Sequence, residues 1–157
     1  MIQIREKGLT GKQLVHLSSD AAAITRGTAT KLFINDRVDI ALAARADGIQ
    51  LTERSLRPSV EKKIAPDLLI CSSVHTIEGA IAACDGGADL VVFGTVFATP
   101  GKGDAQGLDA LQKVCEAVAI PVIAIGGIDE ANLDEVIAAG ASGVAAIRWL
   151  NEKVRAK

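Results

Sequence analysis

The fold is decided by the stretch Ile120-Pro-Val-Ile-Ala-Ile-Gly-Gly-Ile128, which runs directly into Asp129-Glu-Ala-Asn-Leu133. Its apolar and β-branched residues are typical of a buried strand in a parallel sheet, and the two glycines end that strand. Asp129 is a good first residue for a helix, so the pattern predicts a strand, a tight turn and a helix over residues 129–139. The backbone N–H groups of glycines and of a helix N-terminus can bind a phosphate. The glycines could equally be needed only for the geometry of the turn.

The same joint between helix and strand recurs along the chain. Residues 43–51, 83–94 and 138–147 each place an Ala-rich helix end before a Gly or Asp turn and a short apolar strand. Repeated joints of this kind predict βαβ units and a parallel sheet. The expected strands cover residues 2–5, 31–35, 48–51, 68–72, 90–93, 121–125 and 143–147. The expected helices cover residues 11–25, 37–44, 76–83, 108–118, 129–139 and 150–155.

Seven such steps predict a (β/α)₈ TIM-type barrel that lacks the first strand and helix, as a single domain over residues 1–157. A strand at residue 2 leaves no room for a preceding unit. One edge of the sheet is then open, and a loop, a second chain or an upstream segment is expected to cover it. A homo-oligomer is one expected solution.

The composition excludes several classes of protein. Of 157 residues, 49% are hydrophobic, 23% are charged and 3% are aromatic, and the net charge is −2. Such a globular chain, with neither a basic stripe nor stacking residues, is not expected to bind nucleic acid or a membrane. No signal peptide or spanning segment is apparent, and Cys71, Cys84 and Cys115 stand far apart, so buried thiols in the cytoplasm are expected.

Polar residues gather where the first two strands end, which is where barrels bind ligands. Gln3, Arg5 and Lys7 alternate along the chain, so they point to one side and could hold a phosphate or a pyrophosphate. Arg5 and Lys7 could also be ordinary surface charges. Asp36 could bind a divalent cation or cap the helix that follows it.

His75 and the loop at residues 97–107 are further candidates. Histidine changes its charge near neutral pH, so His75, directly before a helix, is a candidate proton shuttle or else a simple polar residue. His16 falls in the middle of a helix and is expected at the surface or in packing. The Gly-rich loop is long enough to be functional, and its Thr99 and Lys102 could close over an anion.

Five stretches together resemble a known family: Gln3-x-Arg5-x-Lys7, residues 33–42, Ser73-Val-His-Thr76, residues 93–102 and residues 123–128. Their order resembles that of the thiamine phosphate synthases and the related TenI thiazole tautomerases, over the length of the chain. The resemblance implies one of two activities. The synthase joins a hydroxymethylpyrimidine pyrophosphate to a thiazole phosphate and releases pyrophosphate with the help of Mg²⁺. The tautomerase moves a proton to aromatise a carboxythiazole phosphate.

The resemblance also implies roles for individual residues, in three groups. The pyrimidine pyrophosphate is held by Gln3, Arg5, Lys7 and Asn35, and Asp36 coordinates Mg²⁺. The pyrophosphate and the thiazole are contacted by Ser73, Thr99, Pro100, Gly101 and Lys102. The thiazole phosphate is received by Gly127, Ile147 and Arg148.

Two positions depart from the synthase pattern. Ser55 stands where the synthases have an aspartate as the second Mg²⁺ ligand, and a hydroxyl is a poor replacement unless Glu53 substitutes. Arg148 stands in place of a phosphate-binding serine and would bind phosphate with another geometry. We therefore predict a tautomerase that needs no cofactor and uses His75 as acid and base. The alternatives are a Mg²⁺-dependent synthase and a non-catalytic ligand-binding or regulatory protein.

Overall fold

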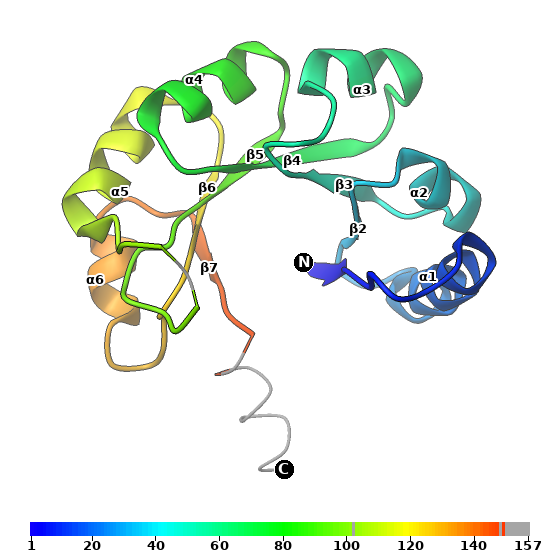
Figure 1. The fold of residues 1–157 in the computed structure, drawn as a ribbon, viewed down its shortest axis with the longest axis horizontal. Helices are drawn as coiled ribbons and strands as arrows, with labels where there is room; N and C mark the ends of the chain where they lie inside the picture. Colours follow the sequence, from blue (N-terminus) through cyan, green and yellow to red (C-terminus); the bar gives the residue numbers. More distant parts are fainter. Residues whose placement is uncertain (102, 148, 150–157) are drawn as a thin grey trace. The chain divides into compact units, whose positions relative to one another are not determined.

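The computed structural model describes residues 1–101, 103–147 and 149, in which strands and helices alternate (Figure 1). The strands are β1 (Ile2–Ile4), β2 (Leu32–Asn35), β3 (Gly48–Leu51), β4 (Leu69–Val74), β5 (Leu90–Phe93), β6 (Val122–Ile125) and β7 (Gly143–Ala145). The helices are α1 (Gly11–Thr25), α2 (Val38–Ala44), α3 (Pro58–Ile64), α4 (Ile77–Asp85), α5 (Gly107–Ala117) and α6 (Leu133–Ala138). Strand order follows chain order, and one helix separates each strand from the next. This is the βα repeat that the sequence predicts.

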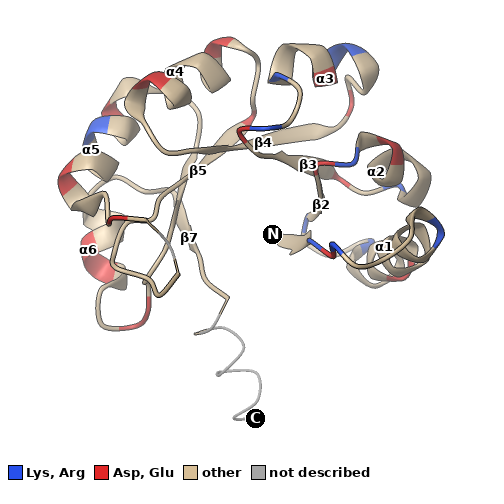
Figure 2. Ribbon diagram, viewed as in Figure 1, with Lys and Arg blue, Asp and Glu red and all other residues tan. Residues whose placement is uncertain are grey.

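The chain divides into two compact units, and a single domain over residues 1–157 stays a prediction. The first unit comprises Met1–Ser72 and Gly86–Ala88, and the second comprises Ser73–Asp85 and Asp89–Lys157. Figure 2 shows charges of both signs on α3 and α5, whereas α4 and α6 carry only Asp and Glu. Among the described residues, no helix is long and apolar enough to cross a membrane.

In the first unit, β1 to β4 are parallel neighbours whose two faces are both buried near the centre of the sheet. Alternate residues, among them Ile34 of β2 and Ile49 of β3, pack in one core with Leu14 of α1. The opposite face buries Gln50 and Cys71. Burial raises the pKa of the Cys71 thiol to about 12, although a hydrogen bond with Gln50 opposes this. The thiol stays protonated, as expected of a structural cysteine.

In the second unit, β5, β6 and β7 are parallel neighbours in chain order. Val91 and Phe93 of β5 and Val122 of β6 are almost fully buried. Helix α5 buries Leu111 and Val114, which lie three residues apart and so face the same side of the helix. Helix α5 therefore packs through one apolar side.

The structure corrects the predicted helix over residues 129–139. Helix α6 begins only at Leu133, because the four preceding residues form a polar turn. The Asp129 N–H donates to Oδ1 of Asn132 at 3.0 Å, and the Ala131 N–H donates to Oδ1 of Asp129 at 2.9 Å. Asp and Asn side chains compete with a helix for backbone donors in this way.

One further helix and one strand end also differ from the prediction. Helix α3 was not predicted, although Pro58 at its first turn and Lys62 and Lys63 in its last turn are typical helix signals. Strand β1 ends at Ile4 and does not include Arg5. The helix predicted over residues 150–155 lies outside the described residues.

Helix α3 buries a carboxylate. Glu61 is 4% exposed, and its Oε2 has no hydrogen-bond partner among the described residues. Burial raises the pKa of Glu61 above its ordinary value, and the negative charge of Asp36 raises it further. Folding therefore favours the protonated form of this side chain.

We expect Glu61→Gln to raise the free energy of unfolding at neutral pH by about 1–3 kcal/mol, because it removes an unpaired buried charge. The folded state binds the Glu61 proton more tightly than the unfolded state does. Wild-type stability therefore falls as pH rises from the ordinary carboxyl pKa to the raised one. Urea unfolding should show the two proteins converging at acid pH and separating toward neutral pH. An equal difference at every pH would contradict this account.

Candidate active site

In the first unit, the structure brings two of the predicted ligand-binding residues together. The register pairs Gln3 of β1 with Phe33 of β2, so Gln3 lies near the end of β2. Nε2 of Gln3 donates a hydrogen bond to Oδ1 of Asn35 at 3.1 Å. Arg5 and Lys7 follow β1 and are exposed. The hydrogen bond thus brings Gln3 and Asn35 together, and a phosphate-binding role for these amides with Arg5 and Lys7 stays a prediction.

Asp36 stands directly after β2 in a left-handed conformation, with φ of 59°. Its N–H donates to the Gln50 carbonyl at 2.9 Å, which extends the pairing of β2 with β3 by one bond. Its carboxylate accepts a hydrogen bond from the Ser55 hydroxyl. The N-cap residue of α2 is Arg37, and its side chain makes no capping hydrogen bond. The suggestion that Asp36 caps this helix is therefore wrong.

Thr52 fixes the Ser55 hydroxyl that faces Asp36. The Thr52 N–H donates to Oγ of Ser55 at 2.8 Å, and the two hydroxyl oxygens lie 3.0 Å apart. Because the single Ser55 proton goes to the Asp36 carboxylate, the Thr52 hydroxyl must donate to Ser55. Ser55 is thus held as a neutral donor to Asp36.

These residues do not make the two-carboxylate Mg²⁺ site that the resemblance implies. Mg²⁺ prefers carboxylate oxygens, and here the neighbour of Asp36 is a hydroxyl. Glu53, the suggested substitute, is exposed. In the described part of the chain, no three His, Cys, Asp or Glu side chains group so that they could hold a metal ion.

In the second unit, His75 directly follows β4, and its ring contacts a backbone carbonyl in the described part of the chain. Its Nδ1 hydrogen-bonds the carbonyl oxygen of Gly94, the residue after β5. Ser73, two residues before His75, is partly buried and points to the same side of the chain. Two predicted site residues therefore share the end of β4.

The glycines after β6 pack closely on the segment after β5. Gly126 and Gly127 have positive φ of 106° and 65°. A Cβ on Gly127 would lie 2.7 Å from Cβ of Phe97, and one on Gly126 would lie 2.6 Å from Cγ2 of Thr95. This packing alone requires glycine, and phosphate binding at the turn stays a prediction.

The loop between β5 and α5 lines an open pocket of ≈ 500 Å³. Its lining includes Thr99, Pro100 and Asp104. The Thr99 hydroxyl donates to the Phe97 carbonyl at 3.1 Å. Gly101 is exposed beside them. The loop thus offers space for a ligand at the carboxyl end of β5.

Three further predicted site residues are Lys102, between β5 and α5 in the sequence, and Ile147 and Arg148, which follow β7. Ile147 is described and is 72% exposed. Lys102 and Arg148 lie outside the described residues. Their predicted roles toward pyrophosphate and thiazole phosphate stay predictions.

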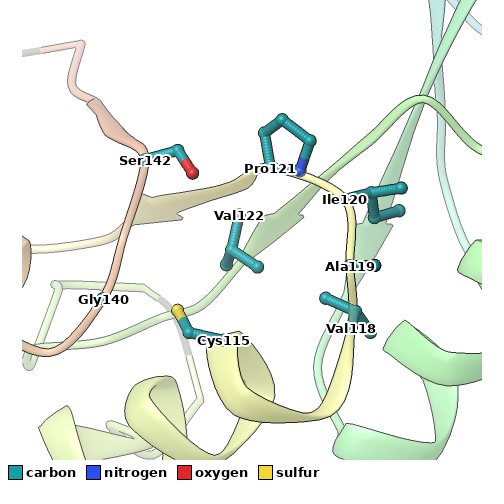
Figure 3. A pocket seen from close by; sticks show the side chains of 8 residues that line it. All are labelled: Cys115, Val118, Ala119, Ile120, Pro121, Val122, Gly140 and Ser142. Carbon is teal, nitrogen blue, oxygen red and sulfur yellow. The ribbon is translucent and has the colours of Figure 1, made fainter.

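A second cavity of ≈ 280 Å³ lies at the opposite, amino-terminal ends of β6 and β7 (Figure 3). Figure 3 shows Cys115, Pro121 and Ser142 around it, with apolar and small neighbours. Burial raises the pKa of the Cys115 thiol, so the thiol stays protonated. The described residues that line this cavity carry no charged side chain, which sets it apart from the polar strand ends.

Sequence reasoning missed two groups at the site. The Gly94 carbonyl holds His75, and Thr52 orients Ser55. Every residue carries a carbonyl, so no sequence signal identifies Gly94. A Thr directly before a polar turn is a weak signal of a local hydroxyl bond.

Alternating βα units with polar residues at the carboxyl ends of the strands define a TIM-type α/β enzyme fold. A family model described as thiamine monophosphate synthase matches residues 1–150. The chain therefore belongs to the thiamine monophosphate synthase (TMP-TENI) family.

Individual relatives agree with this assignment. The chain is 42% identical over 148 residues to the thiamine-phosphate synthase of Pyrococcus furiosus, covering 93% of this chain and 72% of the relative. It is 43% identical over 150 residues to the thiamine-phosphate synthase of Methanoregula boonei, covering 93% and 69%. The solved thiamine phosphate pyrophosphorylase of Pyrococcus furiosus aligns with a TM-score of 0.87 and 40% identity, over 93% of this chain and 71% of that chain. FabK of Thermotoga maritima shares only the fold, with a TM-score of 0.71 at 19% identity over 90% of this chain and 48% of that one.

These findings confirm the TIM-type fold, the family resemblance and the prediction of an enzyme of thiamine biosynthesis. The relatives are named synthases, so their names favour the synthase over the tautomerase. The roles of individual site residues stay predictions.

Proposed function

We propose that this chain acts on a phosphorylated thiazole of thiamine biosynthesis, and that its reaction is the proton transfer of a thiazole tautomerase. The observation that carries the proposal is the neutral Ser55 hydroxyl beside Asp36. It takes the place of a carboxylate that a Mg²⁺-assisted release of pyrophosphate would use. A proton transfer within one substrate needs no such metal.

The second unit supplies the groups that this reaction needs. We assign the substrate phosphate to the backbone N–H groups of the turn at Gly126 and Gly127, two successive glycines with positive φ. His75 takes a proton from a ring carbon and returns one to the exocyclic carbon, so the C–H bond that breaks is balanced by the one that forms. Gly94 contacts His75, and the next residue, Thr95, packs on Gly126, so one short segment serves both groups.

The second candidate is the synthase, which joins a pyrimidine pyrophosphate to the thiazole phosphate. It is favoured by the names of the relatives and by the hydrogen bond between Gln3 and Asn35, which keeps the predicted pyrophosphate-holding pair together. Arg5 and Lys7 would add the positive charge. Mg²⁺ would be required only in this case. The expected cytoplasmic location and homo-oligomeric state stay predictions.

Replacing Ser55 by Asp tests the Mg²⁺ requirement that distinguishes the two candidate functions. We expect Ser55→Asp to strengthen Mg²⁺ binding beside Asp36 by about 10-fold, or about 1.4 kcal/mol, because it restores a second carboxylate. It should also raise Mg²⁺-dependent formation of thiamine phosphate from the two synthase substrates. Calorimetric Mg²⁺ titration and a product assay measure these effects.

The matched control is Ser55→Ala, which removes the hydroxyl without adding charge and should not raise Mg²⁺ affinity. Robust Mg²⁺-dependent synthesis of thiamine phosphate by the unmodified chain would make the synthase the correct function. Turnover of neither set of substrates would support a non-catalytic ligand-binding protein.

A further inference from the structure

We infer that the backbone carbonyl of Gly94 fixes His75 in the tautomer protonated at Nδ1, so that Nε2 is the nitrogen that exchanges a proton with substrate. The role of Nε2 in the reaction rests on the proposed tautomerase function. The tautomer itself rests only on the contact between His75 and Gly94.

A carbonyl oxygen has no proton to give. In the contact between Nδ1 of His75 and the Gly94 oxygen, the nitrogen must therefore be the donor. A neutral imidazole carries one proton, so the Nε2 atom is left with the lone pair that a general base needs. The ring keeps its Nδ1 proton when Nε2 takes up a second proton. The hydrogen bond to the Gly94 carbonyl is therefore present in both the neutral and the protonated ring.

The Gly94 carbonyl is held by the backbone around it. A Cβ on Gly94 would lie 2.0 Å from the Ile125 oxygen at the end of β6, so the backbone segments at Gly94 and Ile125 are in close contact. Two residues further on, the Val96 N–H donates to that same oxygen at 2.9 Å. The Phe97 N–H donates to the Gly126 carbonyl at 3.0 Å. Gly94 is therefore a positioning residue on a fixed strand end.

The other side of the contact is also restrained. The Thr76 hydroxyl, next to His75, accepts a hydrogen bond from the Gly79 N–H at 3.0 Å and so anchors the start of α4. The His75 backbone is thus fixed by a strand before it and a helix after it. With both ends fixed, the imidazole has one defined orientation.

The protein contains two histidines, which gives the experiment an internal comparison. The His16 side chain is 83% exposed, and its Nε2 lies 3.6 Å from the Asp20 carboxylate. An acceptor beside Nε2 favours a proton there, which is the opposite tautomer. The two rings should therefore give different nitrogen spectra in one sample.

The test is nitrogen-15 NMR of the full chain with labelled imidazoles, at a pH where both rings are neutral. We expect the proton of His75 on Nδ1 and that of His16 mainly on Nε2. A His75 protonated at Nε2, or a mixture equal to that of His16, would overturn the inference. Substrate is not required, so the result does not depend on turnover.

Two variants give a second readout. The shorter amide of a His75→Asn variant places a donor near the position of Nδ1, whereas His75→Gln extends its amide toward the position of Nε2. We expect the Asn variant to keep the parent's thermal midpoint more closely than the Gln variant. The reverse order would contradict the role of Gly94. Full turnover by the Asn variant would instead remove the proposed function and leave the tautomer standing.

Discussion

Replacing His75 by Asn is expected to lower the rate of aromatisation of the carboxythiazole phosphate by about 10²-fold or more, the usual effect of losing a general acid and base. The amide keeps the polarity and approximate size of the ring but cannot carry a proton between two carbons. The affinity for the aromatic product should change little, because His75 is not assigned to the phosphate. Steady-state turnover and product titration measure the two quantities separately.

The control for this prediction is His16→Asn, on the exposed side of α1. It should leave turnover unchanged, since the His16 side chain is 83% exposed and lies beside Asp20 of the same helix. If the His75→Asn protein turned over at nearly the parent rate, His75 would be only a polar residue before a helix.

Gly94→Ala is expected to lower the free energy of unfolding by about 3 kcal/mol, at the upper end of what overpacking costs. The added methyl group would meet the Ile125 carbonyl oxygen at 2.0 Å and its Cγ2 at 2.9 Å. Relief requires β5 and β6 to separate where Val96 donates to Ile125. Urea unfolding should show an earlier midpoint, and turnover should fall because the carbonyl that holds His75 moves.

Gly103→Ala is the matched control, in the loop that follows. Among the residues that the structure describes, no atom outside the neighbouring residues lies within 4 Å of a Cβ at this position. Its stability should therefore stay within about 0.5 kcal/mol of the parent, as for most surface substitutions. Equal stability of the two variants would show that the end of β5 is not tightly packed on β6.

The sequence predicted those parts of the fold that depend on repeated local patterns. Strand β6 and its glycine turn were expected because apolar β-branched residues followed by two glycines have few other structures. The start of α6 was misplaced because Asp129 and Asn132 bond to backbone N–H groups within their own turn. Helix α3 was missed because it buries Glu61 while leaving Val60 and Ile64 partly exposed, the reverse of the usual pattern.

The residues of the candidate site could be named from the sequence, but their contacts could not. Asp36, Ser55 and His75 could be named because strand ends carry ligands and because their order resembles that of a family. The bond between Ser55 and Asp36 joins residues 19 positions apart through a turn whose geometry Thr52 sets. The partner of His75 is a backbone atom, which has no signature in any sequence.

The most direct test of the proposed reaction is the aromatisation of carboxythiazole phosphate by the unmodified full chain in an excess of a metal chelator. A tautomerase that works through His75 should turn the substrate over at the same rate with the chelator as with added Mg²⁺. The account would be contradicted if the chain left this substrate unchanged and instead formed thiamine phosphate from the pyrimidine pyrophosphate and the thiazole phosphate only when Mg²⁺ was present.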